Sequence, residues 1–466
     1  MLFNSYLFVL AFLPVVLAAW WLLPLRSEQR LATLAGASYV FYGLWDWRFT
    51  GLLAASTLLD YAIGKRLHAA TTSGGRKRWM LASVSLNLGV LAVFKYAGFA
   101  ASSFNSVAAW LQSGGRLPVW DIVLPVGISF YTFQTMSYAT DIYRREAKPA
   151  SSIWHFAAYV SMFPQLVAGP IVRYADVDAQ LKSATRRIDW NQFASGVRFF
   201  VAGMAQKVLL ADLMASRIAP LWEEPAQLQL VGAWFAMLGY AVQLYFDFAG
   251  YSNMAVGLGR MLGFEFCQNF DSPYQSESIQ AFWRRWHMSL GRMLRDYLFI
   301  PLGGNRGGAI LTVRNLLAVM LLGGLWHGAG WTFVLWGAYH GALLAVNALW
   351  RIGGGFTLPR SVAQAATFLA VVGGWVLFRA ASLQEAGDVY GAMLGARGVE
   401  GEPLAAVGGV AAAAVLAALL SATWFLPNLW RIPERLNAWS GALAAAVLTL
   451  CLLRFDSASP FLYFQF

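Results

Sequence analysis

The chain has 466 residues, of which 58% are hydrophobic and only 12% are charged, whereas a soluble globular domain carries about 25% charged residues. This composition excludes an ordinary water-soluble fold and makes the lipid bilayer the expected solvent. The net charge of +11 is typical of basic cytoplasmic loops in a bacterial inner membrane protein, so we expect no nucleic-acid partner.

Apolar stretches of about 17 to 25 residues, long enough to cross the bilayer as helices, recur along the whole chain. They lack the period-2 alternation of a β-barrel, and backbone groups in lipid must be paired internally. We therefore predict an all-α, polytopic integral membrane protein with roughly 11–12 membrane-associated helices, including re-entrant segments. No linker or low-complexity tract divides it, so a single domain over residues 1–466 is expected in the bacterial cell inner membrane.

The N-terminal half begins with an apolar run to Pro24 that no Lys or Arg precedes, so we expect no cleaved signal peptide and an external N-terminus. Residues 153–172 are apolar but have basic flanks and contain Pro164 and Pro170, which predicts a re-entrant segment shielded by protein. Helices are predicted in this half near 31–46, 49–64, 79–98 and 122–141.

The C-terminal half contains the most basic segment, residues 284–314, which the positive-inside rule places in the cytoplasm. The GLGRMLG stretch at 257–263 has the spacing of a dinucleotide loop, but no βαβ unit surrounds it, so we expect helix packing by small residues. Cys267 and Cys451 belong to no ligand pattern, and neither a disulfide nor structural zinc is expected. Helices are predicted near 193–216, 228–248, 315–327, 331–350, 362–379, 403–425 and 439–454.

His327 lies in GGLWHGAGW, about twelve residues or 18 Å into a helix that starts near Asn315. An ionisable group at this depth is by default a functional candidate. The neighbouring glycines leave room for a ligand, and Trp326 and Trp331 supply rigid walls. A neutral core histidine that bonds between helices is the alternative, and position alone does not separate the two.

His287 lies in FWRRWHMSLGRMLRDYLFIPLGGNR, residues 282–306. On one continuous helix its apolar side chains, Trp286 among them, would share a face, and Arg284 and Arg285 would lie elsewhere. Such a helix either anchors the chain on anionic lipid headgroups or lines a cytoplasmic entrance where arginines bind the phosphates of coenzyme A. Composition favours the anchor.

Asp247 and Asn253 in YFDFAGYSN form a polar cluster that we place at the inner end of the helix predicted over 228–248. A carboxylate there would orient a histidine or an arginine, or would simply bond between helices. The chain has neither an HExxH nor a GxSxG motif, so soluble metalloprotease and hydrolase chemistry is not indicated.

The sequence resembles the membrane-bound O-acyltransferase family, and specifically the branch that includes the membrane subunit of bacterial alginate and cellulose acetylation. The resemblance covers essentially the whole chain. It is carried by LPVGISFYTFQTMSYATDIYR (124–144), FPQLVAGPIVRY (163–174), QKVLLAD (206–212), YFDFAGYSNMAVGLGRMLGF (245–264), residues 282–306, LWHGAGWTFVLWGAYHG (325–341) and PFLYFQF (460–466).

The resemblance implies an essential histidine that corresponds to His327 and a second family position at His287. Asn253 stands where relatives often carry an acidic residue, so we expect no acid–base role there. The implied site has His327 and His287 as catalytic residues. The residues expected to bind the donor are Arg284, Arg285, Trp286, Asp247, Asn253 and Trp326.

The implied reaction moves an acetyl group from cytoplasmic acetyl-CoA to a hydroxyl of an exported polysaccharide, directly or through a periplasmic acetyltransferase partner. Acetyl-CoA is a substrate, membrane lipids are the other partners, and no bound cofactor or metal is expected. A neutral imidazole, with an ordinary pKa of about 6.5, suits a general base. An acyl-histidine intermediate is a variant.

Three alternatives stay open. The related D-alanyl transfer to teichoic acids shares the histidine, and lipid acyl transfer is a more distant second, but YLFIPLGGNRGG (297–308) and the terminal YFQF resemble the acetylation branch. A non-catalytic transporter or scaffold of a polysaccharide export complex is the third. Broken helices with polar residues also mark transporters, but the chain shows no inverted repeat.

Overall fold

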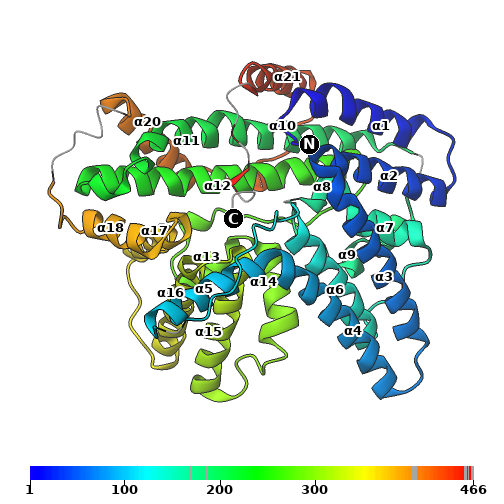
Figure 1. The fold of residues 1–466 in the computed structure, drawn as a ribbon. Helices are drawn as coiled ribbons and strands as arrows, with labels where there is room; N and C mark the ends of the chain where they lie inside the picture. The colour runs from blue at the N-terminus through cyan, green and yellow to red at the C-terminus, as the bar shows by residue number, and fades with distance from the viewer. Residues whose placement is uncertain are drawn as a thin grey trace. The chain divides into compact units, whose positions relative to one another are not determined.

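The computed structural model describes the chain except for residues 113, 168, 185–186, 400–406, 456–458, 460 and 463–466. Every regular element within the described residues is a helix, and no strand occurs among them (Figure 1). The predicted all-α class is confirmed.

Five helical stretches of the described residues are long and apolar enough to cross a membrane. Because about 20 apolar helical residues span the hydrocarbon core, the chain is a multi-pass membrane protein, as predicted. The five stretches are Ser73–Trp110, Trp190–Trp222, Gly308–His327, Trp331–Ile352 and Arg360–Arg379. Shorter apolar helices cover Leu7–Leu22, Gly409–Phe425 and Ala438–Leu452.

The described residues separate into two compact units, and the first comprises Met1–Phe200 and Met254–Cys267. Its elements are η1 (Leu7–Phe12), α1 (Leu13–Leu22), α2 (Ser27–Asp46), η2 (Trp47–Phe49), α3 (Thr50–Ala69), α4 (Ser73–Leu91), η3 (Ala92–Tyr96), α5 (Ala97–Trp110), α6 (Ile128–Arg144), α7 (Ile153–Ser161), α8 (Phe163–Leu166), α9 (Tyr174–Lys182) and most of α10 (Trp190–Ala205).

An aromatic cluster holds the broken segment of this unit in place. Phe8, Phe12, Phe41 and Phe163 pack with ring centroids 5.3 to 6.1 Å apart. Phe163 opens α8, which follows α7 after a break at Met162. The irregular backbone predicted within residues 153–172 is therefore present, and protein buries it.

The second unit comprises Val201–Asn253 and Gln268–Phe466. Helix α12 contributes to both units, and the prediction of one domain over residues 1–466 stays a prediction. The elements of the second unit are η4 (Gln206–Ala211), α11 (Asp212–Ile218), η5 (Ala219–Trp222), η6 (Pro225–Gln227), most of α12 (Leu230–Met261), η7 (Pro273–Gln275), α13 (Ile279–Arg285), α14 (Met288–Leu294), η8 (Arg295–Phe299), α15 (Gly308–His327), α16 (Trp331–Ile352), α17 (Arg360–Arg379), α18 (Leu383–Met393), α20 (Gly409–Phe425), η9 (Leu429–Arg431) and α21 (Ala438–Leu452).

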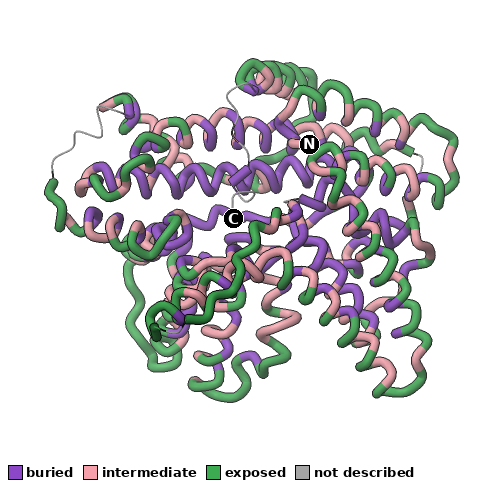
Figure 2. The backbone as a smooth tube through the Cα atoms, viewed as in Figure 1, coloured by how far each residue is buried: buried purple, intermediate pink, exposed green. Residues whose placement is uncertain are grey.

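Helix α12 is 32 residues long and is buried along most of its length (Figure 2). Its glycines allow close contact with α10 within the first unit: a Cβ on Gly196 would lie 2.7 Å from the carbonyl oxygen of Gly257. Most of the GLGRMLG stretch is thus helical and packs by small residues, which confirms that interpretation.

Several predicted helix bounds differ from those observed, and two ends lie far from the prediction. The helix predicted to stop near residue 98 continues through η3 and α5 to Trp110. The helix predicted over 228–248 runs from Leu230 to Met261, so Asp247 and Asn253 lie inside it and not at its end. Polar side chains inside α12 have partners on other elements, and such partners cannot be read from local hydropathy.

Candidate active site

His327 is the last residue of α15, a helix that begins at Gly308. The helix therefore starts seven residues before the predicted Asn315, and the expected position of His327 about twelve residues into the helix is wrong. The turn at 328–330 then reverses the chain into α16. At 20 residues, α15 is about 30 Å long, and His327 lies at its far end.

Glycines bring α15 and α16 close enough to enclose the His327 ring. A Cβ on Gly337 would collide with the carbonyl oxygen of Met320, and one on Gly324 with that of Phe333. Only glycine permits this approach. The imidazole of His327 is 5% exposed, with ring centroids 5.0 Å from Trp326 and 5.4 Å from Phe378.

His287 interrupts the predicted amphipathic helix over residues 282–306, and the prediction of one continuous helix there is wrong. Its backbone has φ +46° and ψ +54°, the left-handed conformation, and it separates α13 from α14. This conformation is uncommon for a residue with a side chain. It turns the chain so that the His287 ring is buried, with 1% exposure.

Asn269 holds the His287 ring through its side-chain amide. The backbone N–H of Ser289 donates to Asn269 Oδ1 at 3.2 Å, and Asn269 Nδ2 donates to Ser252 Oγ at 3.0 Å. A backbone N–H only donates, which fixes the amide oxygen on this side. His287 Nδ1 lies 3.1 Å from the same Oδ1, so Nδ1 carries the proton and Nε2 is the ring's acceptor.

Burial lowers the pKa of the His287 imidazole from 6.5 to about 3. His287 lies outside the five membrane-crossing stretches. The neutral form therefore prevails throughout the physiological range, in agreement with the hydrogen-bond pattern around Asn269.

One cavity of about 210 Å³ in the second unit is lined by both histidines. Its walls are mainly apolar and come from α13 to α16. The lining residues are Gln280, Trp283, Arg284, His287, Leu290, Gly291, Leu294, Arg295, Phe299, Leu316, Val319, Met320, Gly323, His327, Trp336 and Leu344.

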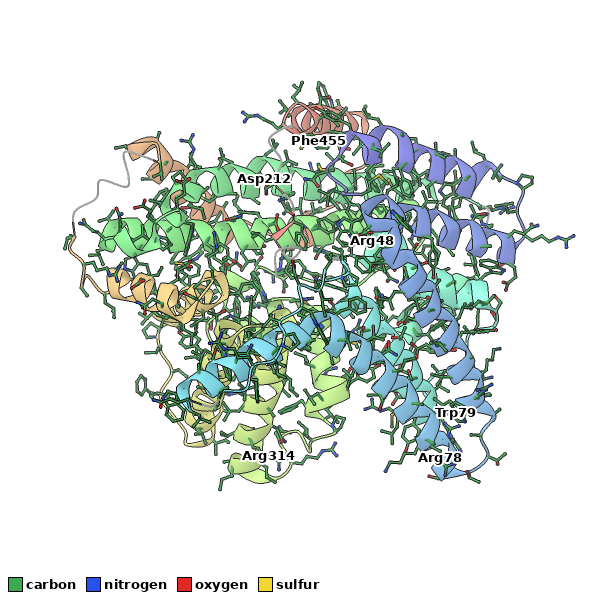
Figure 3. The ribbon with its side chains drawn as sticks, viewed as in Figure 1. Arg48, Arg78, Trp79, Asp212, Arg314 and Phe455 are labelled. Atoms are coloured by element: carbon green, nitrogen blue, oxygen red, sulfur yellow. The ribbon has the colours of Figure 1, made fainter. Side chains whose placement is uncertain are left out.

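The cavity is elongated along α15. Its α15 lining runs from Leu316 to His327, a rise of about 16 Å. At the inner end, the His327 ring lies 5.0 Å from that of Trp336. Leu344, two turns further along the antiparallel α16, marks the other end, near the start of α15 where Figure 3 labels Arg314.

Basic side chains surround the outer end. Arg351 near the end of α16 donates to Gln280 Oε1, and Arg284 lies one helical turn after Gln280 on α13. Arg284 and Arg295 line the cavity and are exposed. Arg295 also pairs with Asp296 at 2.7 Å. Arginine side chains at such a mouth can bind phosphate oxygens through paired N–H groups.

Other residues predicted for the site lie outside the cavity lining. Trp286 is buried with its ring 4.9 Å from Trp375, and the Arg285 carbonyl accepts the backbone N–H of Asp271 at 3.0 Å. Trp326 lies between the two histidines, 6.1 Å from the His287 ring. These residues therefore pack against the residues that line the cavity.

Asp247 and Asn253 bond to residues other than the two cavity histidines. Asp247 pairs with Lys207 at 2.5 Å, so of the two possibilities that the sequence left open it makes a bond between elements. Asn253 donates to Gln206 at 2.8 Å and accepts from Trp430 at 3.2 Å. Among the described residues no cluster of three or more His, Cys, Asp or Glu side chains could hold a metal.

Asn269, Arg295 and Trp336 belong to the site's surroundings but were not predicted. Asn269 follows Cys267 in a segment without a recognisable motif, and no sequence signal indicates it. Arg295 was visible as part of the basic segment, and Trp336 follows His327 by nine residues on the next helix. Only the tertiary structure brings these residues to the site.

Comparison with known proteins gives consistent similarities. A sequence model of the membrane-bound O-acyltransferase family matches residues 34–353, which include both histidines. The chain is 46% identical over 396 residues to the probable alginate O-acetylase of Azotobacter vinelandii, covering 84% of this chain and 78% of that protein. It is 40% identical to the probable alginate O-acetylase of Pseudomonas putida, with 100% of both chains covered. The peptidoglycan O-acetyltransferase of Helicobacter pylori is 36% identical, with 86% of this chain and 81% of that protein covered.

Proposed function

The chain belongs to the membrane-bound O-acyltransferase family, and we propose that it moves acetyl groups from cytoplasmic acetyl-CoA toward hydroxyls of an exported polysaccharide. The polysaccharide is of the alginate or cellulose type, and transfer is direct or passes through a periplasmic partner protein. The chain itself would reside in the bacterial inner membrane. The family makes the chain an O-acyltransferase; the donor, the direction and the acceptor are the proposal.

The observation that carries the proposal is the single cavity lined by His287 and His327. A narrow apolar channel with arginines at its mouth suits a donor with a phosphorylated head and a thin, extended arm. Arg284 and Arg295 would bind the phosphates. The thioester would then lie beside His327 at the inner end.

The proposed chemistry uses the His327 imidazole, which lines an apolar wall, as a general base. His327 takes the proton of the incoming hydroxyl while the hydroxyl oxygen attacks the thioester carbonyl. A carbon–oxygen bond forms, the carbon–sulfur bond breaks, and the departing thiolate receives the proton from the imidazolium. His287 lines the same cavity and would shape the wall against which the donor lies. Other residues would support this site from outside the cavity lining: Arg285, Trp286, Asp247, Asn253 and Trp326.

The names of the relatives favour acetyl transfer over D-alanyl transfer, because the two alginate relatives and the peptidoglycan relative are all O-acetylating proteins. A transporter or scaffold would need no imidazole at the inner end of this cavity. Supplying purified protein with labelled acetyl-CoA, and separately with an aminoacyl donor, distinguishes the donors.

The experiment that tests the proposal replaces His327 with Ala in a strain that lacks the native gene. Removal of a general base lowers rates by about 10²- to 10⁴-fold, so ester-linked acetate on the exported polymer should fall to background while the protein still inserts and binds donor. His68→Ala is the matched control, because His68 is exposed at the end of α3. Normal acetate in the His327→Ala strain would remove the catalytic assignment and favour a scaffold.

A further inference from the structure

A cluster of buried charges lies in the second unit, apart from the cavity lining. Lys207 of η4 pairs with Asp247 of α12 at 2.5 Å and with Asp212 of α11 at 2.8 Å. The side chains of Lys207 and Asp247 are each 1% exposed, and that of Asp212 is 7% exposed. We call these three residues the anchor cluster. Figure 3 labels Asp212 on its helix.

Ser459 and Leu462 complete this cluster; together with Phe461 they are the described residues that we call the C-terminal segment. Ser459 Oγ accepts from Lys207 Nζ at 3.0 Å and donates to Asp212 Oδ1 at 2.6 Å. The backbone N–H of Leu462 donates to Asp247 Oδ2 at 3.0 Å. A buried carboxylate is costly unless its oxygens are bonded, so the segment contributes polar contacts that the cluster requires. The segment is thus held at two points, three residues apart.

Phe461 lies between the anchor and the His287 side of α12. Its ring, on a residue that is 1% exposed, stacks on Tyr251 with centroids 4.6 Å apart and lies 5.6 Å from Phe248. Phe248 in turn presents an edge to the His287 ring at 4.7 Å. Asp247 and Phe248 are successive residues of α12, so the helix connects the anchor cluster directly to the contact between the Phe248 and His287 rings.

We infer that the anchor cluster fixes the C-terminal segment, and that Phe461 then holds the His287 ring in the cavity wall through Phe248. The inference rests on the proposed function, because it assigns a task to His287 in that cavity. His287 is at a break between two helices, so its ring depends on side-chain neighbours for its position. Asn269 holds the Nδ1 edge, and Phe248 supports the ring. Lys207, Asp247 and Phe461 are positioning residues, and none lines the cavity.

The first test measures attachment of the segment without any substrate. In a protein whose native cysteines are replaced by Ala, a Leu462→Cys substitution introduces a thiol at a position that is 7% exposed in the native chain. A membrane-permeant maleimide should label it slowly in the parent and at least tenfold faster when Lys207→Met is added. Asp388→Asn is the matched control, since Asp388 pairs with Arg397 on another part of the unit. Unchanged labelling in Lys207→Met would refute the claim that the anchor cluster fixes the C-terminal segment.

The second test measures positioning by a double-mutant cycle. Phe461→Ala should lower kcat about tenfold with little change in KM for acetyl-CoA, because small displacements of a site group cost rate. In a His287→Ala background, Phe461→Ala should lower kcat less than twofold. Phe461→Tyr, which keeps the ring, should restore most of the rate.

The outcomes separate the two proposals. Equal losses from Phe461→Ala in both backgrounds would show a general structural effect and refute positioning through His287. Failure of the proposed function would instead appear as normal polymer acetate in the His327→Ala strain, and the labelling result would stand in either case.

Discussion

His287 Nδ1 lies 3.1 Å from Oδ1 of Asn269, which precedes it by 18 positions. This hydrogen bond ties the break between α13 and α14 to the segment before them. The same Oδ1 accepts from the backbone and hydroxyl of Ser289. One amide therefore fixes both the tautomer of the imidazole and the start of α14.

Replacing Asn269 with Leu should destabilise the protein and impair catalysis. Leaving buried polar groups without partners costs about 1–3 kcal/mol each, and the His287 Nδ1 proton and the Ser289 N–H would both lose their acceptor. Thermal unfolding in detergent should show a clear drop in the midpoint. Asn191→Leu, at an exposed position near the start of α10, should change it much less; equal shifts would contradict a special role for Asn269.

Arg284 and Arg285 should differ in their effect on donor binding, although they are neighbours in the sequence. Arg284 lines the cavity and Arg285 does not. A hydrogen bond to a charged group is worth about 1.5–3 kcal/mol, so Arg284→Gln should raise KM for acetyl-CoA about tenfold with kcat nearly unchanged. Arg285→Gln should change KM less than about twofold. Steady-state kinetics at several donor concentrations provide the check, and a larger effect at Arg285 would refute the proposed mouth.

The pH profile of the reaction should be insensitive to His287 between pH 5 and 8. Because burial lowers its pKa to about 3, the imidazole is already neutral at pH 5 and gains a proton only on further acidification. His287→Gln should therefore lower the rate without changing the shape of the profile over this range. A limb that disappears in the variant would mean that His287 titrates during catalysis.

Close contact between α15 and α16 should not tolerate a methyl group at Gly337. A Cβ there collides with backbone atoms of α15, and overpacking costs about 1–3 kcal/mol. Gly337→Ala should lower the thermal midpoint and the activity together, since the same hairpin presents His327. Gly387→Ala is the matched control, because nothing lies within 4 Å of its Cβ position and Ala favours the helix there. Similar stability in both variants would contradict the packing account.

The sequence by itself determined the membrane environment and the helical class, and it singled out His327 as the candidate general base. Long apolar stretches admit few structures in lipid, and an imidazole in the glycine-rich stretch around His327 is conspicuous because ionisable groups are costly there. The close packing of Gly257 was also predictable, because small residues at helical spacing have few other uses in such a chain.

Tertiary structure alone decided which polar residues meet. Local pattern predicted a continuous helix through His287, but bonds to Asn269, far from it in the sequence, stabilise a left-handed break there. Hydropathy likewise placed Asp247 at a helix end. In the structure Asp247 lies inside α12, where Lys207 neutralises its charge and the backbone N–H of Leu462 donates to one of its oxygens. Periodicity reports the average environment of a segment, and the partner of a single buried polar group comes from distant parts of the chain that only folding brings together.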